Sequence, residues 1–183
     1  MYLVSRGIAG AVALALTAGA AQAQAGLTSS PATVSLTATK AATLTVSPTS
    51  ATATLASITD SSAANVFSAV NLTTSWNLTS GTSVNLVGWF ATPAQALANG
   101  TDYIPSSKVE GRVGAAAFAP FTSGATGGVG VANGSLMLFS QAVGAGTYFG
   151  SRSDQLDVRL NLANTATVAG NYTGTLNLQA VVQ

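Results

Sequence analysis

Apolar residues alternate with serine and threonine along most of the chain, and this two-residue period limits what the sequence can fold into. Successive side chains of an extended strand point to opposite faces, so a strand with one buried face has this period. The clearest runs lie at residues 66–79, 84–90, 107–114, 136–143, 156–162 and 172–182. The sequence therefore predicts an all-β fold, an antiparallel β-sandwich of about eight or nine short strands, with a closed barrel as the alternative.

Two of these runs predict a hairpin. Residues 66–79 place Leu72, Thr74 and Trp76 on one face of a strand. Ser80-Gly81 then supplies turn residues, and residues 84–90 return as the second strand. We also expect the even-numbered residues of 156–162 and of 176–182 to face the core.

One short helix is expected in a loop. Thr92 is a suitable N-cap, Pro93 suits the first helical position, and Asn99-Gly100 is typical of a helix end. Residues 114–134, which are rich in glycine and alanine, are expected to form a long loop or a weak strand flanked by turns.

The N-terminal residues have the layout of a secretory signal peptide. Arg6 precedes an apolar run at residues 8–16, and small residues follow up to Ala21-Gln22-Ala23, an A-x-A cleavage pattern. The apolar run is shorter than the roughly 20 residues that a membrane span needs. We therefore expect residues 1–23 to be removed and residues 24–183 to form a single β-sandwich domain without a membrane span. The expected location is secreted, extracellular or at the cell surface, with the periplasm as the alternative.

The chain has few side chains that can carry out chemistry. It contains 6 Lys and Arg, 5 Asp and Glu, and neither histidine nor cysteine. This composition excludes Ser-His-Asp and Cys-His catalysis, the usual zinc sites and disulfides. The net charge is +1 and there is no basic run, so nucleic acid is not an expected partner. Asp60 and Asp102 are interpreted as turn residues rather than calcium ligands. We predict a protein that is not an enzyme and has no catalytic residue, metal or cofactor.

The densest group of charges lies at residues 152–159. Arg152 and Asp154 share one face of an expected strand, and Asp157 and Arg159 share the other face. Two carboxylates are the groups that hydrolyse glycosides. However, an arginine beside each carboxylate favours its ionised form, which opposes the role of a general acid. We interpret the group as a self-neutralising strand edge that discourages pairing with other chains.

The aromatic residues allow two interpretations. Trp76 and Trp89 are expected in or near the core, because large aromatic rings dominate core burial. Alternatively, Trp76, Trp89, Tyr103 and Tyr148 are candidate platforms on which sugar rings stack, and the protein is then an extracellular glycan-binding module with a polysaccharide partner.

The end of the sequence resembles a known class of domain. Residues 169–180 (AGNYTGTLNLQA) place a Gly-x-Tyr turn before a final alternating strand. This stretch resembles the last strand of bacterial Ig-like and pilin-like sandwiches. The segments TSWNL at residues 74–78 and SRSD at residues 151–154 are similar to parts of secreted bacterial proteins. The resemblance implies an extracellular sandwich.

The function expected from these features is structural. A near-zero net charge removes the repulsion that keeps proteins apart, so we expect a cell-surface protein that associates with itself or with other surface proteins, as a filament or coat subunit does. Residues 24–47 contain a single charge, at Lys40, and have strand-like alternation. This segment either adds as a strand to a neighbouring subunit or pairs within its own domain, and the sequence leaves both alternatives open.

Overall fold

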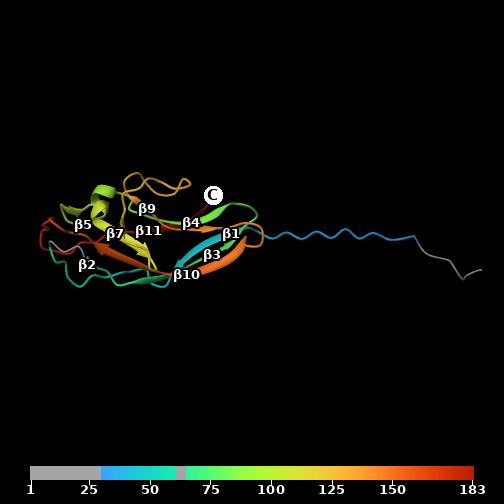
Figure 1. Cartoon of the computed structure of the whole chain (residues 1–183), viewed down its shortest axis with the longest axis horizontal. Coiled ribbons are helices and arrows are strands. Elements are labelled where there is room, and N and C mark those ends of the chain that lie inside the picture. The colour runs from blue at the N-terminus through green and yellow to red at the C-terminus, as the bar shows by residue number, and fades with distance from the viewer. Residues whose placement is uncertain (1–29, 61–64) are drawn as a thin grey trace, which may run out of the picture. The chain divides into compact units, whose positions relative to one another are not determined.

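The structure is a computed structural model that describes residues 30–60 and 65–183. The chain divides into two units, Met1–Thr39 and Lys40–Gln183. In the second unit, two antiparallel sheets face each other, which confirms the predicted all-β sandwich (Figure 1). The predicted cleavage site after Ala23 lies outside the described residues.

The larger sheet has the strand order β1-β3-β10-β7-β8. The last two residues of β10 lie beyond its pairing with β3 and pair with β2 instead. Its strands are β1 (Thr43–Pro48), β2 (Asn65–Val66), β3 (Val70–Asn77), β7 (Val109–Val113), β8 (Ala119–Pro120) and β10 (Phe149–Leu160). β10 is thus a central strand, with β3 on one side and β7 on the other.

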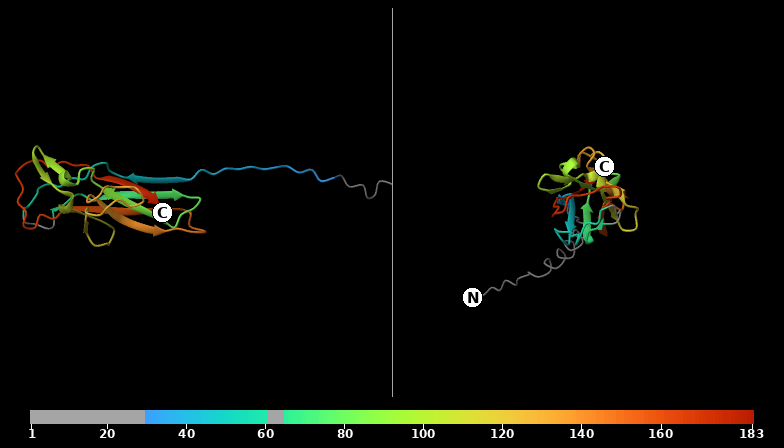
Figure 2. Two further views of the ribbon diagram at one scale, coloured as in Figure 1. Left: turned by 90° about the horizontal axis from the view of Figure 1, so that it is seen from above. Right: turned by 90° about the vertical axis from the view of Figure 1, so that its left-hand side faces the viewer.

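The smaller sheet has the order β11-β4-β9 and forms the second layer (Figure 2). Its strands are β4 (Ser83–Trp89), β9 (Ser135–Ala142) and β11 (Asn177–Val182). A separate hairpin joins β5 (Leu97–Asn99) to β6 (Asp102–Ile104). The helical elements among the described residues are two single turns of 3-10 helix, η1 (Pro93–Gln95) and η2 (Ser106–Lys108).

The core lies between the two sheets. Phe121 is completely buried there, and its ring meets the ring of Phe90 edge to face, with 5.2 Å between centroids. Two strand glycines make room for Phe121, because a Cβ at Gly88 or Gly111 would come within 3.0 or 2.9 Å of its ring. One aromatic side chain therefore fills the space between the facing sheets.

The predicted inward faces are confirmed at the best-patterned strands. Leu156, Leu160 and Leu162 are 2%, 0% and 0% exposed. Trp76 is 7% exposed, and its indole Nε1–H donates to the carbonyl of Thr147 at 3.0 Å. The interpretation of Trp76 as a core residue is therefore confirmed.

The predicted hairpin between residues 66–79 and 84–90 is wrong. β3 pairs with β1 and β10 in the larger sheet, whereas β4 pairs with β9 and β11 in the smaller sheet. The connection after Asn77 therefore crosses from one sheet to the other. Both strands bury apolar side chains in the same core, and a two-residue period does not say which strand is the neighbour.

The predicted short helix is also wrong beyond its first turn. The Gln95 N–H donates to the Thr92 carbonyl at 2.9 Å, which closes η1, but the Thr92 side chain makes no cap hydrogen bond. Leu97 is buried in the core as part of β5, and Gly100, with φ at 62°, turns the chain into β6. A helix of less than two turns does not offset its nucleation cost, so core burial of Leu97 decides the local structure.

The long loop predicted at residues 114–134 is anchored at three points. The guanidinium groups of Arg112 and Arg159 both contact the ring of Phe118, with their Cζ atoms 4.4 and 4.1 Å from its centroid. Three residues later Phe121 enters the core. Gly127 then lies against Val181 of β11, because a Cβ on this glycine would be 2.8 Å from a Val181 methyl carbon. The loop therefore holds the larger sheet to the smaller one.

The candidate strand-exchange segment, residues 24–47, has more than one structure. Its last residues, from Thr43, belong to β1 and pair with β3 in the same chain. Pro48 ends β1, as the sequence predicts. Residues 30–39, in the first unit, have no regular secondary structure, and the described part of the segment before Thr43 belongs to no strand.

Candidate functional site

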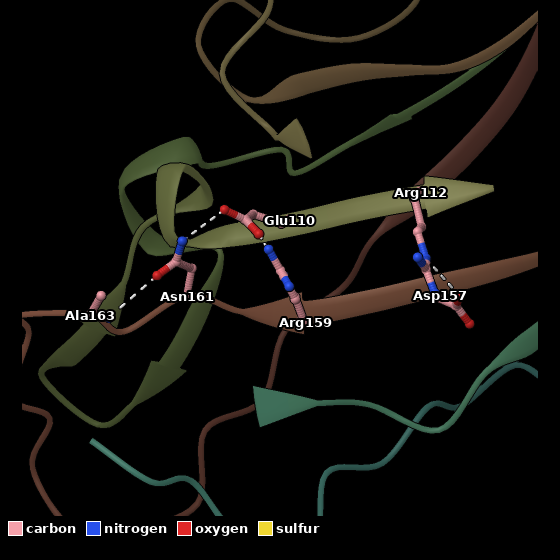
Figure 3. Close-up of polar contacts among 6 residues, drawn as sticks. All are labelled: Glu110, Arg112, Asp157, Arg159, Asn161 and Ala163. Carbon is pink, nitrogen blue, oxygen red and sulfur yellow. Dashed lines mark hydrogen bonds and ion pairs between the residues drawn. The ribbon is translucent and has the colours of Figure 1, made fainter. Parts of the chain in front are cut away.

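Two charged residues of β10, Asp157 and Arg159, form ion pairs with residues of the neighbouring strand β7 (Figure 3). The Asp157 carboxylate accepts a hydrogen bond from Arg112 Nε at 3.0 Å, and the Glu110 carboxylate accepts one from Arg159 Nε at 2.6 Å. Both pairs join directly opposite residues of β7 and β10. The prediction of a self-neutralising strand edge is therefore wrong for Asp157 and Arg159, because β10 lies between β3 or β2 and β7 at these positions and β7 provides their partners.

Further polar contacts occupy the remaining carboxylate oxygens of this network. Asn161 Nδ2 donates to Glu110 Oε1 at 2.9 Å, and Gln155 Nε2 donates to Asp157 Oδ1 at 2.8 Å. The ring of Phe118 makes cation–π contacts with the two arginines of the network. With every carboxylate oxygen already bound, this network joins two strands and offers no free acid or base for catalysis.

The Arg152–Asp154 pair lies on the opposite face of β10, toward the core. Asp154 stands opposite Leu72 and Arg152 opposite Thr74, and both of these β3 residues are buried. The guanidinium donates from Nε and Nη2 to the two carboxylate oxygens, each at 2.6 Å. The hydrogen bond to Asp154 raises the pKa of Arg152 against the opposing effect of burial, so the arginine stays charged. The predicted pairing of these two residues is confirmed.

The four predicted sugar platforms do not form one surface. Trp76 is buried, so its ring cannot accept a ligand and its assignment as a platform is wrong. Trp89, on β4, is half-buried. Tyr148, immediately before β10, is half-buried as well. Tyr103, on β6, is 45% exposed and is the most accessible of the four.

A groove of about 320 Å³ opens between the two sheets, and we call it the seam groove. Its floor is the core itself, with Phe90, Val109 and Leu156 almost completely buried. Its walls are small or apolar and include Pro48, Ala51, Phe67, Thr175, Leu176 and Leu178. None of the residues that line it is charged.

The seam groove lies beside strands that have a free edge. Its walls include the last residue of β1 and the beginning of β11. Within the described part of the chain, β1 pairs only with β3, and β11 pairs only with β4. β1 and β11 lie beside each other at the seam without pairing, so each has one side on which no strand hydrogen bonds form in the described residues. No local sequence pattern indicates this groove, because its walls come from segments more than a hundred positions apart.

Several other kinds of site are not found in the described residues. There, no group of three or more acidic side chains is placed to hold a metal ion. No helix in residues 30–60 and 65–183 is long and apolar enough to cross a membrane. Compared with known proteins, the chain matches no protein-family model and no curated protein.

Proposed function

We propose that this protein is a non-enzymatic structural protein of the bacterial cell surface that assembles by strand addition. Residues 30–39 of one copy enter the seam groove of the next copy and pair with the free edge of β11. Strand addition of this kind combines backbone hydrogen bonds with side-chain pockets.

The observation that carries this proposal is the exposure of two apolar side chains on residues 30–39. Val34 is 81% and Leu36 is 91% exposed. These residues are two apart, with Ser35 between them, so both side chains fall on one face of an extended segment. Apolar side chains arranged for a strand but without a strand partner favour pairing with another chain.

The segment and the groove have matching chemistry. Residues 30–39 contain no charged side chain, and the lining of the seam groove contains none either. A strand that enters the groove therefore buries no unpaired charge. Its apolar face contacts an apolar floor, and its backbone meets the unpaired groups of β11.

The expected affinity of a single contact is weak. Burying one valine and one leucine contributes about 1.5–3 kcal/mol each. Association costs roughly 4–15 kcal/mol, and backbone hydrogen bonds add to the favourable side. We therefore expect assembly that depends on protein concentration.

The proposed contact is heterologous, because the segment and the groove are different surfaces of the same molecule. Such a contact produces either a closed ring or an open filament, depending on the rotation between copies. The low net charge of +1 opposes neither outcome.

Two double substitutions test the proposal. Val34→Asp with Leu36→Asp places two charges on the apolar face, whereas Ser35→Asp with Thr37→Asp places the same charges on the opposite face of the same segment. Sedimentation velocity and negative-stain electron microscopy measure assembly, and circular dichroism verifies the fold of each variant.

We expect the unsubstituted protein to form oligomers or filaments, the first variant to stay a folded monomer, and the control to keep most of its assembly. The proposal fails if the unsubstituted protein is monomeric at every concentration. It also fails if both variants assemble equally well.

A further inference from the structure

Two charged side chains stand apart from the others in the described part of the chain. The side chains of Asp102 and Lys108 take part in no hydrogen bond, ion pair or ring contact there. By contrast, Asp60 accepts hydrogen bonds from Thr167, and Lys40 lies over the ring of Phe149. The remaining charged residues from Glu110 onward belong to the three ion pairs described above.

Asp102 and Lys108 line the same pocket, which has a volume of about 110 Å³ and which we call the tyrosine pocket. Tyr103 and Tyr172 line it as well, and the buried side chain of Leu162 closes its inner side. The predicted turn at Asp102 is wrong, because Asp102 belongs to β6 and pairs with Asn99. In this strand position the Asp102 carboxylate makes no hydrogen bond to the neighbouring backbone among the described residues.

The walls of the tyrosine pocket are fixed by hydrogen bonds. Ala98 pairs with Tyr103 and also exchanges two backbone hydrogen bonds with Thr173, at 2.8 and 3.0 Å. The Tyr172 hydroxyl donates to the Val168 carbonyl at 3.0 Å. Thr167 is held by its hydroxyl, which donates to the Asp60 carboxylate at 2.6 Å. A preformed pocket of this kind lowers the cost of ordering side chains when a ligand binds.

We propose that the tyrosine pocket binds one sugar ring of a polysaccharide. The exposed face of Tyr103 provides an apolar surface for the C–H groups of a ring. The Asp102 carboxylate accepts hydrogen bonds from ring hydroxyls, and the Lys108 ammonium donates to hydroxyl oxygens. The two charges cancel, so the site suits a ligand with many hydroxyl groups and no large net charge.

The size of the pocket agrees with partial burial of a single ring. Its volume corresponds to the share of about four water molecules in the liquid. That space accepts part of one ring and leaves the rest of a sugar chain outside. This binding site is separate from the seam groove, with which it shares no lining residue.

An NMR titration of the isotope-labelled protein tests this inference. The probes are methyl α-D-glucopyranoside, the methyl glycoside of glucuronic acid and the methyl glycoside of glucosamine, which differ in charge. We expect at least one probe to cause saturable shifts confined to residues 101–108 and 162–173. The probe that binds tightest shows whether Lys108 or Asp102 dominates recognition.

Matched variants assign the binding to the pocket. Tyr103→Ala and Lys108→Met are expected to weaken binding about tenfold or more, equivalent to about 1.4 kcal/mol. Tyr148→Ala and Lys40→Met remove the same residue types outside the pocket and are expected to bind like the unsubstituted protein. The inference is overturned if none of the three probes causes saturable shifts, if the shifts centre elsewhere, or if Tyr103→Ala and Lys108→Met both bind unchanged.

Discussion

Replacing Thr74 with valine is expected to stabilise the protein. Thr74 is completely buried on β3, opposite Arg152 of β10 and Val46 of β1. Its hydroxyl oxygen has no hydrogen-bond partner among the described residues. A buried hydroxyl without a partner has lost its hydrogen bonds to water and gained none in return. Valine has nearly the same shape and puts a methyl group in place of that hydroxyl.

The size of the effect follows from this single change. An unsatisfied buried polar group costs about 1–3 kcal/mol, and Thr74→Val removes that cost without opening a cavity. We therefore expect the free energy of unfolding to rise by about 1 kcal/mol or more. For a chain of this length, each kcal/mol raises the melting temperature by roughly 2–4 °C.

Urea denaturation followed by the fluorescence of Trp76 and Trp89 measures this effect. The control is Thr73→Val, one position away on the other face of β3, where the hydroxyl makes a 3.2 Å hydrogen bond with Ser153. The control is expected to change the free energy of unfolding by less than about 0.5 kcal/mol or to lower it. A Thr74→Val protein that is less stable than the original by 1 kcal/mol would refute the reasoning, because its hydroxyl must then have a partner.

Three further substitutions test the packing of the sandwich, each by urea denaturation. Trp76→Ala is expected to cost about 3–5 kcal/mol because it empties a core position; a cost below about 0.5 kcal/mol would place the ring at the surface. Phe118→Ala removes both arginine contacts and is expected to cost about 1–2 kcal/mol and to speed proteolysis within residues 114–134; unchanged cleavage would contradict the anchoring of this loop. Asp154→Asn leaves Arg152 without its carboxylate and is expected to cost about 1–3 kcal/mol, so an unchanged stability would show that the pair is not formed in solution.

The elements that bury one regular face are predictable from the sequence. Leu156, Leu160 and Leu162 alternate with polar residues, and the structure buries all three. The alternation of side chains between two faces is a local property of an extended backbone, so it does not depend on which strand is the neighbour. For the same reason the sequence predicts that β3 and β4 are strands but not that they belong to different sheets.

The burial and pairing of residues outside an alternating pattern cannot be predicted from the local sequence. Phe121 follows a stretch rich in glycine and alanine, and no local pattern indicates that it fills the centre of the core. Its burial depends on Gly88 and Gly111, one from each sheet, whose lack of a side chain matters only once the sheets face each other. The pairing of Asp157 with Arg112 also depends on sheet order, because these residues are brought together by β7 and β10.

The two candidate binding sites differ in how much of each the sequence indicates. Tyr103 was recognised as an exposed aromatic, but its neighbours Lys108 and Tyr172 come from η2 and from the approach to β11. The alternation around Val34 and Leu36 indicates a strand, and only the structure shows that residues 30–39 have no strand assignment and that both side chains are exposed. The sequence thus identifies single members of each site, and the tertiary fold is needed to assemble the rest.

Cross-linking between copies tests strand addition most directly. The chain has no cysteine, so Thr37→Cys and Thr175→Cys introduce two unique reactive groups, one on the polar face of the segment and one on the wall of the seam groove. The doubly substituted protein is treated with a short bis-maleimide and separated on a denaturing gel. Strand addition predicts a ladder of dimers, trimers and longer species, which disappears when either cysteine is omitted. A product that consists only of monomer, with or without an internal link, would contradict it.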